Sequence, residues 1–223
     1  MTAAQWLAVS EHRLLSVSAG QFWHDGLGCA ADLEKLRFYP DGVRLYLIAS
    51  QWDILASEQA FVGRCAGRGD EIGTRILIAR MCERLMRLCF LYRGQYAPYP
   101  KWLGTAFERL EVPNRLRAEI RAALGTADLT GAERHLLAAQ LETARLHNES
   151  GLAEPVECRA GSYYGRPMQV IFAERFAEAA VRKLRGTALE GVPLIGSFSQ
   201  IGGLSEFSDD PGFYSRIGGL YRK

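Results

Sequence analysis

The stretch that decides the fold is residues 58–104, EQAFVGRCAGRGDEIGTRILIARMCERLMRLCFLYRGQYAPYPKWLG. Its pattern predicts a Gly-rich turn at 67–69, a long helix at about 71–94 and an aromatic–proline turn at 95–100. Asp70 directly precedes the long helix and is expected to cap it. Because this helix is apolar on nearly all sides, we expect it to lie at the centre of a bundle.

The flanking segments predict further helices and little strand. Apolar residues at helical spacing favour helices at 3–9, 29–37, 43–65, 101–110, 113–124, 131–148 and 169–184. Residues 13–24 alternate loosely and are expected to be extended or a short hairpin, and another strand is expected at 155–159. Thr130 and Glu133 form a capping-box pattern. Phe172 is expected on the buried face of the last of these helices.

These elements predict a mainly α fold in a single helical domain, residues 1–223. The expected architecture is an irregular helical bundle around the central helix at about 71–94, with a few short strands or extended segments. We expect the core at about 10–184 and an irregular, Gly-rich tail, 185–223, packing on it. A chain of 223 residues that is 48% apolar and 23% charged can bury a sizeable core.

Cysteine usage and hydropathy indicate a cytoplasmic protein. The five cysteines form no C-x-x-C pair and are odd in number, which argues against a disulfide framework or a zinc knuckle. The N-terminal segment lacks the basic and apolar regions of a signal peptide. No stretch approaches the roughly 18–20 apolar residues that cross a membrane, so no membrane partner is expected.

Several enzyme motifs are absent from the sequence. There is no Walker A loop, no dinucleotide-binding fingerprint and no H-x-x-x-H pair. Gly196-Ser197 followed by Asp209-Asp210 superficially matches the metal site of polymerase-beta-type nucleotidyltransferases. Adjacent acids on a strand would point to opposite faces, however, so no metal site is predicted.

Positive charge is concentrated in the central stretch. The whole chain has a net charge of +2, whereas residues 64–101 contain eight basic and three acidic residues. Arg80, Arg84 and Arg87 recur at i, i+4 and i+7 and share one helix face. A helix that reads nucleic acid needs exposed basic side chains, and this one is expected to be buried, so nucleic acid is not an expected partner.

Two interpretations of the charged residues stay open. Guanidinium groups on an apolar helix need partners, which are either acidic side chains or an anionic ligand. A structural salt-bridge network would join Arg75 and Arg80 to Glu58, Asp70 or Glu71. A phosphate or anionic-substrate site would be lined by Arg64, Arg75, Arg80 and Lys101.

The turn after the long helix and the preceding acid are further candidates. The rigid turn contains Tyr96 and Tyr99 and is followed by Lys101 and Trp102. These side chains are able to clamp a planar ligand. The alternative is a helix connection with core aromatic residues. Glu58, among arginines, is a candidate general base for a hydroxyl, or only the partner of an arginine.

The string WDILASEQAFVGRCAGRGDEIGTRILIARMCERLMRLCFLYRGQYAPYPKWLGTAFERL resembles the bacterial domain-of-unknown-function 4037 family. LLSVSAGQFWHDGLG and FYPDGVRLYLIASQWD before it, and QVIFAERFAEA and PLIGSFSQ after it, extend the resemblance to about residues 10–223. In this family the helical region typically follows a polymerase-beta-type nucleotidyltransferase domain. By analogy with related two-domain transferases, the resemblance implies Glu58 as a base, Asp70 and Arg75 as shaping a cleft, and Lys101 as a phosphate contact.

The resemblance implies the helical substrate-side or accessory domain of a nucleotidyltransferase-like protein. The metal-binding half is missing, so no transfer by this chain alone is expected. Whether the sequence is a piece of a longer protein, one half of a split gene or a copy that has lost the chemistry stays open. Nucleotide and Mg²⁺ are expected only with a transferase domain, upstream or on a partner chain, and a small-molecule or nucleotide ligand is an expected partner. The alternative is a protein-interaction module whose buried salt bridges are purely structural.

Overall fold

The computed structural model describes residues 1–21, 23–201, 212 and 216–221, and its described part is mainly helical, as predicted. The main helices are α4 (Asp41–Glu58), α5 (Phe61–Ala66), α6 (Glu71–Arg93), α8 (Asn114–Gly125), α9 (Leu129–Glu149) and α10 (Glu174–Arg182). The shorter ones are α1 (Ala3–Ala8), α2 (Glu11–Ser18), α3 (Ala30–Glu34), α7 (Pro100–Arg109), α11 (Phe198–Ile201) and the 3-10 helix η2 (Gly218–Tyr221). Asp209-Asp210 lies outside the described residues.

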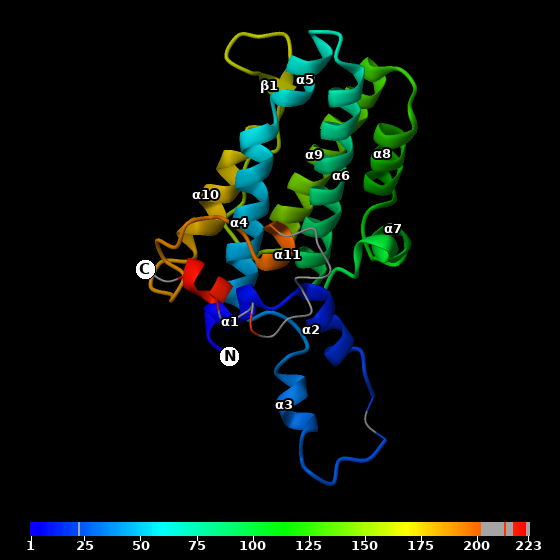
Figure 1. Cartoon of the computed structure of the whole chain (residues 1–223). Coiled ribbons are helices and arrows are strands. Elements are labelled where there is room, and N and C mark those ends of the chain that lie inside the picture. The colour runs from blue at the N-terminus through cyan, green and yellow to red at the C-terminus, as the bar shows by residue number, and fades with distance from the viewer. Residues whose placement is uncertain (22, 202–211, 213–215, 222–223) are drawn as a thin grey trace.

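Helix α6 is the central element of the bundle. It contacts α4, α5, α8 and α9, and Figure 1 shows it between α4 and α8. The Asp70 side chain caps its start by accepting a hydrogen bond from Gly73 N at 2.8 Å. Gly94 ends it in the left-handed conformation, with φ of 65°. The predicted central helix is therefore confirmed to within one residue.

The burial of α6 is uneven along its length. Met81, Leu85 and Leu88 are fully buried, whereas Ile72 and Ile76 near the N-terminal end are exposed. The expectation of a helix buried on nearly all sides therefore holds only for its C-terminal half. That half packs on the hydrophobic core, and its remaining face is occupied by charged side chains.

Two long-range interactions changed the expected helix pattern. The helix predicted at 43–65 is two helices, α4 and α5, separated at Gln59 and Ala60. The Gln59 amide accepts from Ala173 N at 3.2 Å and donates to Glu174 Oε2 at 2.9 Å, so it joins this break to the start of α10. Residues 13–18, the first half of a segment expected to be extended or a short hairpin, instead belong to helix α2, which buries Leu14 against the core.

Three smaller predictions were also wrong. No strand forms at 155–159; within the described ranges the sheet is one antiparallel pair, β1 (Gly161–Ser162) with β2 (Gln169–Val170). Asp128 caps α9, in place of the expected Thr130 capping box, because its carboxylate accepts from the amides of Thr130 and Gly131. Phe172 precedes α10 with a positive φ of 57°, so it does not lie on that helix's buried face.

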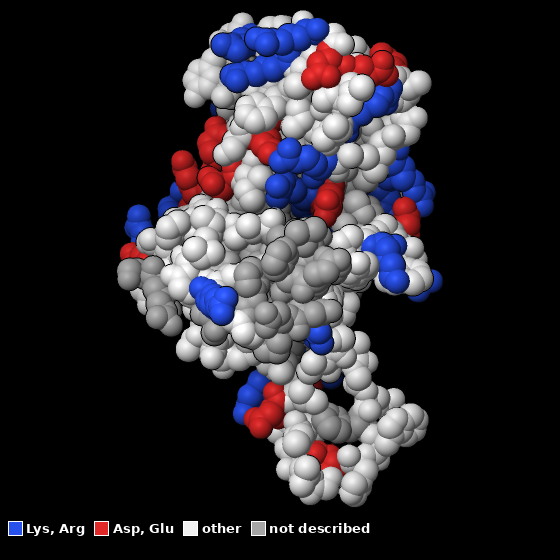
Figure 2. Space-filling view, viewed as in Figure 1, with Lys and Arg blue, Asp and Glu red and all other residues white. Residues whose placement is uncertain are grey.

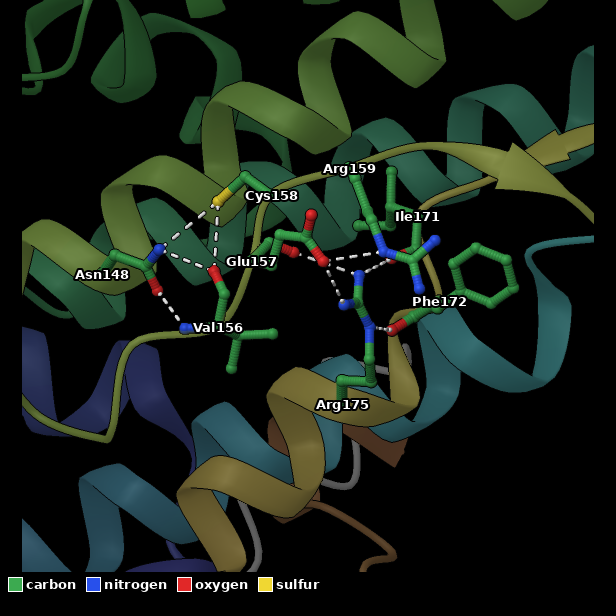
Figure 3. A network of polar contacts seen from close by, with 8 residues as sticks. All are labelled: Asn148, Val156, Glu157, Cys158, Arg159, Ile171, Phe172 and Arg175. Atoms are coloured by element: carbon green, nitrogen blue, oxygen red, sulfur yellow. Dashed lines mark hydrogen bonds and ion pairs between the residues drawn. The ribbon is translucent and has the colours of Figure 1, made fainter.

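Side-chain to backbone bonds hold the irregular segment between α9 and α10 (Figure 3). Asn148 on α9 accepts from Val156 N at 2.9 Å and donates to Val156 O at 2.8 Å. Arg175 on α10 donates to the carbonyls of Glu157 and Ile171 at 3.1 and 3.0 Å. These bonds satisfy backbone groups of Val156, Glu157 and Ile171, which lie outside the β1–β2 pair.

A buried polar chain links three helices of the core. Trp52 Nε1 on α4 donates to Tyr92 Oη on α6 at 2.6 Å, and that oxygen lies 3.0 Å from His147 Nδ1 on α9. The Phe176 ring from α10 stacks on Trp52 with ring centroids 4.7 Å apart. Burial lowers the pKa of His147 to about 4, and its Nε2 has no hydrogen-bond partner in the described structure.

The N-terminal helices lie at one end of the bundle. Trp6 and Leu7 of α1 are buried, whereas α3 and the loop before it project away from the bundle (Figure 1). Trp23 and Leu27 on that loop are 94% and 91% exposed. At the same end, Tyr46 Oη on α4 donates to Pro193 O, and Tyr221 Oη donates to Gly196 O. These two bonds tie described parts of the C-terminal segment to each other and to α4.

We predict that His147 makes the stability of the fold pH-dependent. Its folded pKa of about 4 lies below the ordinary value of 6.5, so the unfolded chain binds the proton first. Stability is therefore fully present above pH 6.5 and falls as the pH drops from 6.5 to 4, by about 3 kcal/mol at most. Urea unfolding across this range should show a smaller pH dependence for His147→Gln than for the wild type. Parallel curves for the two proteins would contradict the prediction.

Asn148→Ala should destabilise the fold by about 2 kcal/mol, because it removes two hydrogen bonds to Val156. Hydrogen exchange should accelerate at residues 154–158 more than elsewhere. Asn114→Ala is the matched control, since Asn114 Oδ1 only accepts a local, exposed bond from Arg117. An equal loss of stability in both variants would show that the Asn148 bonds to Val156 stabilise the fold no more than an exposed local bond does.

Candidate functional site

A polar pocket of about 400 Å³ lies where α2, α4, α6, the turn before α7 and α11 meet. Its lining residues are Ser10, Glu11, His12, Gln51, Arg80, Glu83, Arg84, Arg87, Ala97, Pro98, Tyr99, Pro100, Phe198, Ser199, Gln200 and Ile201. The three arginines of the α6 face are all among them, so the spacing seen in the sequence does place them at one cavity. On the face seen in Figure 2, basic and acidic side chains lie side by side over the upper and middle parts of the bundle.

Two of these arginines have carboxylate partners. Arg87, 13% exposed, lies 2.9 Å from Glu83 Oε1 through Nη2 and 3.6 Å from Glu11 Oε2 through Nη1. Arg80 Nη2 donates to Glu58 Oε1 at 2.5 Å. Glu58 itself is not among the lining residues, and its Oε2 is buried without a hydrogen bond in the described structure.

Arg84 differs from its two neighbours. Within the described residues it makes no ion pair or hydrogen bond, and its Nε is buried and unsatisfied. Burial lowers its pKa, while the nearby Glu58 opposes that shift. A guanidinium nevertheless stays charged in a protein, so Arg84 brings an unpaired positive charge to the pocket wall.

Glu11 connects the walls of the pocket. Its Oε1 accepts from Ala97 N at 2.9 Å, and its own backbone N donates to Ser199 Oγ at 2.7 Å. Burial raises the pKa of this carboxyl group, against the opposing effects of Arg87 and of the Ala97 amide. Glu11 thus fixes α2 to the turn before α7 and to α11 through one residue.

Two buried polar side chains face the same cavity without partners. Gln51 on α4 and Ser10, the residue before α2, are each 1% exposed and line the pocket. Gln51 Oε1 and Ser10 Oγ have no hydrogen bond in the described structure. An unsatisfied buried polar atom is costly, so both positions favour a polar occupant of the cavity.

Several residues expected at an anion site lie elsewhere. Arg75 Nη1 and Nη2 donate to the carbonyls of Thr126 and Ala127 at 3.2 and 2.5 Å, and Nη2 also pairs with Glu71. Arg75 therefore joins α6 to the turn between α8 and α9. Asp70 caps α6, as described above. The Arg64 guanidinium lies 6.0 and 5.9 Å from the centroids of the Phe61 and Tyr163 rings.

The aromatic turn is divided between the core, the pocket and the surface. Tyr96 is buried and its Oη donates to Leu36 O at 3.0 Å, so it is a core residue. Tyr99 lines the pocket, with its ring centroid 5.9 Å from that of His12. Lys101 Nζ lies 5.8 and 5.7 Å from the centroids of the Tyr99 and Trp102 rings. Trp102 lines a separate pocket of about 390 Å³ beside α7.

Of the expected site residues, the structure thus brings only Arg80 and Tyr99 to the polar pocket. The sequence analysis missed Arg84, Glu11, Gln51 and Ser10 as candidates. The i, i+4, i+7 spacing already placed Arg84 beside Arg80, so that signal was present in the sequence. Glu11 and Ser10 lie far from α6 in the chain, and only the tertiary fold brings them to it.

The described residues contain no group of three His, Cys, Asp or Glu side chains arranged to hold a metal ion. Among the helices that the structure describes, none combines the length and apolar character needed to span a bilayer. The five cysteines are all free. The pocket wall offers three guanidinium groups, the carboxylates of Glu11 and Glu83, and neutral hydrogen-bonding groups.

Residues 6–103 match the family model of the domain of unknown function DUF4037. This segment belongs to the DUF4037 family. The predicted family is thus confirmed for α1 to α6 and the start of α7, and the expected extension to residue 223 lies outside the match. No match is found among the curated proteins or among the solved structures. Every residue lining the polar pocket falls within the DUF4037 segment except the four residues of α11.

We predict that Arg75 is a structural residue and not a ligand contact. Arg75→Gln should lower the free energy of unfolding by about 1–2 kcal/mol, because it removes bonds to two carbonyls of the α8–α9 turn. Arg121→Gln, which breaks an exposed pair with Glu108, should cost less than about 1 kcal/mol. Chemical denaturation of both variants tests the difference, and equal losses would contradict it.

Proposed function

We propose that this chain is the helical substrate-side domain of a nucleotidyltransferase-like protein, and that its polar pocket holds the ligand. The observation that carries the proposal is the pocket itself. Most of its lining residues come from the DUF4037 segment, and three arginines lie on one wall, one of them unpaired among the described residues. A cavity of about 400 Å³ is large enough for a small molecule or a nucleotide.

In this role the chain binds and positions, and the transferase partner supplies the reaction. Arg80, Arg84 and Arg87 would neutralise an anionic part of the ligand, and the buried Gln51 and Ser10 would orient its polar groups. Nucleotide and Mg²⁺ would be held jointly with a transferase domain, upstream or on another chain. The free cysteines support a reducing, cytoplasmic setting for this work.

The second candidate is a protein-interaction module with a purely structural charge network. It is favoured by the ion pairs of Arg75, Arg80 and Arg87, each of which has a carboxylate partner. Under that proposal the pocket residues would matter for stability alone. The unpaired Arg84 and the unsatisfied Gln51 are the features that this alternative leaves without a role.

Calorimetric titration of the chain with nucleotides, with and without Mg²⁺, distinguishes the two. The substrate-side proposal predicts saturable binding that Arg84→Gln weakens about tenfold or more, since a charged hydrogen-bonding partner is lost. It also predicts no nucleotidyl transfer by the chain alone. Robust transfer by the isolated chain would contradict the accessory role. Absence of nucleotide binding by the folded chain would favour the interaction module.

A further inference from the structure

We propose that the polar pocket is a phosphoryl-binding site, and that its ligand is a small phosphorylated molecule carrying hydroxyl groups. Arg84 is the principal phosphoryl contact, Arg80 and Arg87 flank it, and Gln51 with Ser10 recognises the hydroxyl groups. This inference rests on the proposed role of the pocket as a ligand site. It does not depend on any transferase partner.

The charge distribution around Arg84 leads to this assignment. The three carboxylates nearest the arginine row, Glu11, Glu58 and Glu83, already contact Arg80 or Arg87. Arg84 has five N–H donors and, within the described structure, no direct partner for them. A phosphoryl group offers several acceptor oxygens and two negative charges, which matches a guanidinium bordered by two more.

The position of Arg84 strengthens its electrostatic attraction to a bound anion. Arg84 is half-buried and its Nε is fully buried, and a partly buried charge is screened less than an exposed one. Arg80 is about half exposed and pairs with Glu58, which does not line the cavity. Neutralising Glu58 would weaken this pair and leave the Arg80 guanidinium free to bind the anion in the cavity.

Arg84 needs a ligand with hydrogen-bond acceptors, whereas Gln51 and Ser10 indicate that the same ligand also carries hydrogen-bond donors. Both side chains are 1% exposed, line the cavity and have unsatisfied oxygen atoms. Gln51 Oε1 accepts hydrogen bonds only, so its ligand partner must be a donor such as a hydroxyl or N–H group. The O–H groups of inorganic phosphate sit on the same group that Arg84 would hold, whereas a phosphorylated sugar also carries separate hydroxyl donors for Gln51. The cavity volume of about 400 Å³ accommodates a molecule of that size.

The test is calorimetric titration of the full chain with inorganic phosphate and with ribose 5-phosphate. The wild type should bind ribose 5-phosphate more tightly than phosphate. Arg84→Gln should weaken both ligands about tenfold or more, and Glu58→Gln should strengthen both by releasing Arg80. Arg121→Gln removes the same charge from the surface of α8 and should leave both affinities unchanged.

Gln51→Met provides the second measurement. It keeps the size of the side chain but removes the acceptor, so it should abolish the preference for ribose 5-phosphate and leave phosphate binding intact. Circular dichroism and urea unfolding confirm that each variant is folded before titration. The conservative Arg84→Lys, which keeps the charge, should retain more affinity than Arg84→Gln.

Three results would overturn the assignment. They are the absence of binding of either probe to the folded wild type at millimolar concentration, equal affinities of the wild type and Arg84→Gln, and equal binding of succinate and phosphate. The outcome is separable from that of the proposed function. Phosphate binding without any nucleotide binding would uphold this site and reject the substrate-side role. Nucleotide binding that Arg84→Gln weakens, with no binding of inorganic phosphate or ribose 5-phosphate, would do the reverse.

Discussion

The packing of α6 is the constraint on which the rest of the structure depends. Most of its C-terminal half is buried in the core, so Glu83, Arg84 and Arg87 emerge on a face that the core does not cover. Arg80, Arg84 and Arg87 follow that face at helical spacing. The same burial that stabilises the bundle therefore gathers three guanidinium groups along a single wall.

Neighbouring segments provide carboxylates that pair with two of these three arginines. Glu58 and Glu83 pair with Arg80 and Arg87, and Glu11 reaches Arg87 from the N-terminal region. Because Glu11 also binds the Ala97 amide, the pairing fixes α2 against the turn that leads to α7. A fully paired row would be a structural network, and Arg84 is the member that departs from it. That departure, together with the unsatisfied Gln51, is the observation on which the proposed ligand site rests.

The parts of the fold that depend on local signals were predictable. Asp70 and Gly94 mark the ends of α6 by side-chain capping and by a left-handed turn, both of which are readable in the sequence. The break between α4 and α5 was not predictable, because it depends on hydrogen bonds between Gln59 and the start of α10, more than a hundred residues away. Likewise the sequence does not separate Arg75 from Arg80. In the structure Arg75 donates hydrogen bonds to two carbonyls of the turn between α8 and α9, and it does not line the pocket.

The sequence by itself determined the mainly helical class, the central helix, the spacing of its arginines and the family of residues 6–103. These follow from periodicity, capping and motif, which act over a few residues. Only the tertiary structure decided which arginines share a cavity and which polar residues face them. Ser10, just before α2, and Gln51, on α4, line the same cavity as Arg84, and no local rule specifies that arrangement. Its physical cause is the burial of apolar surface throughout the bundle, which fixes all of these positions together.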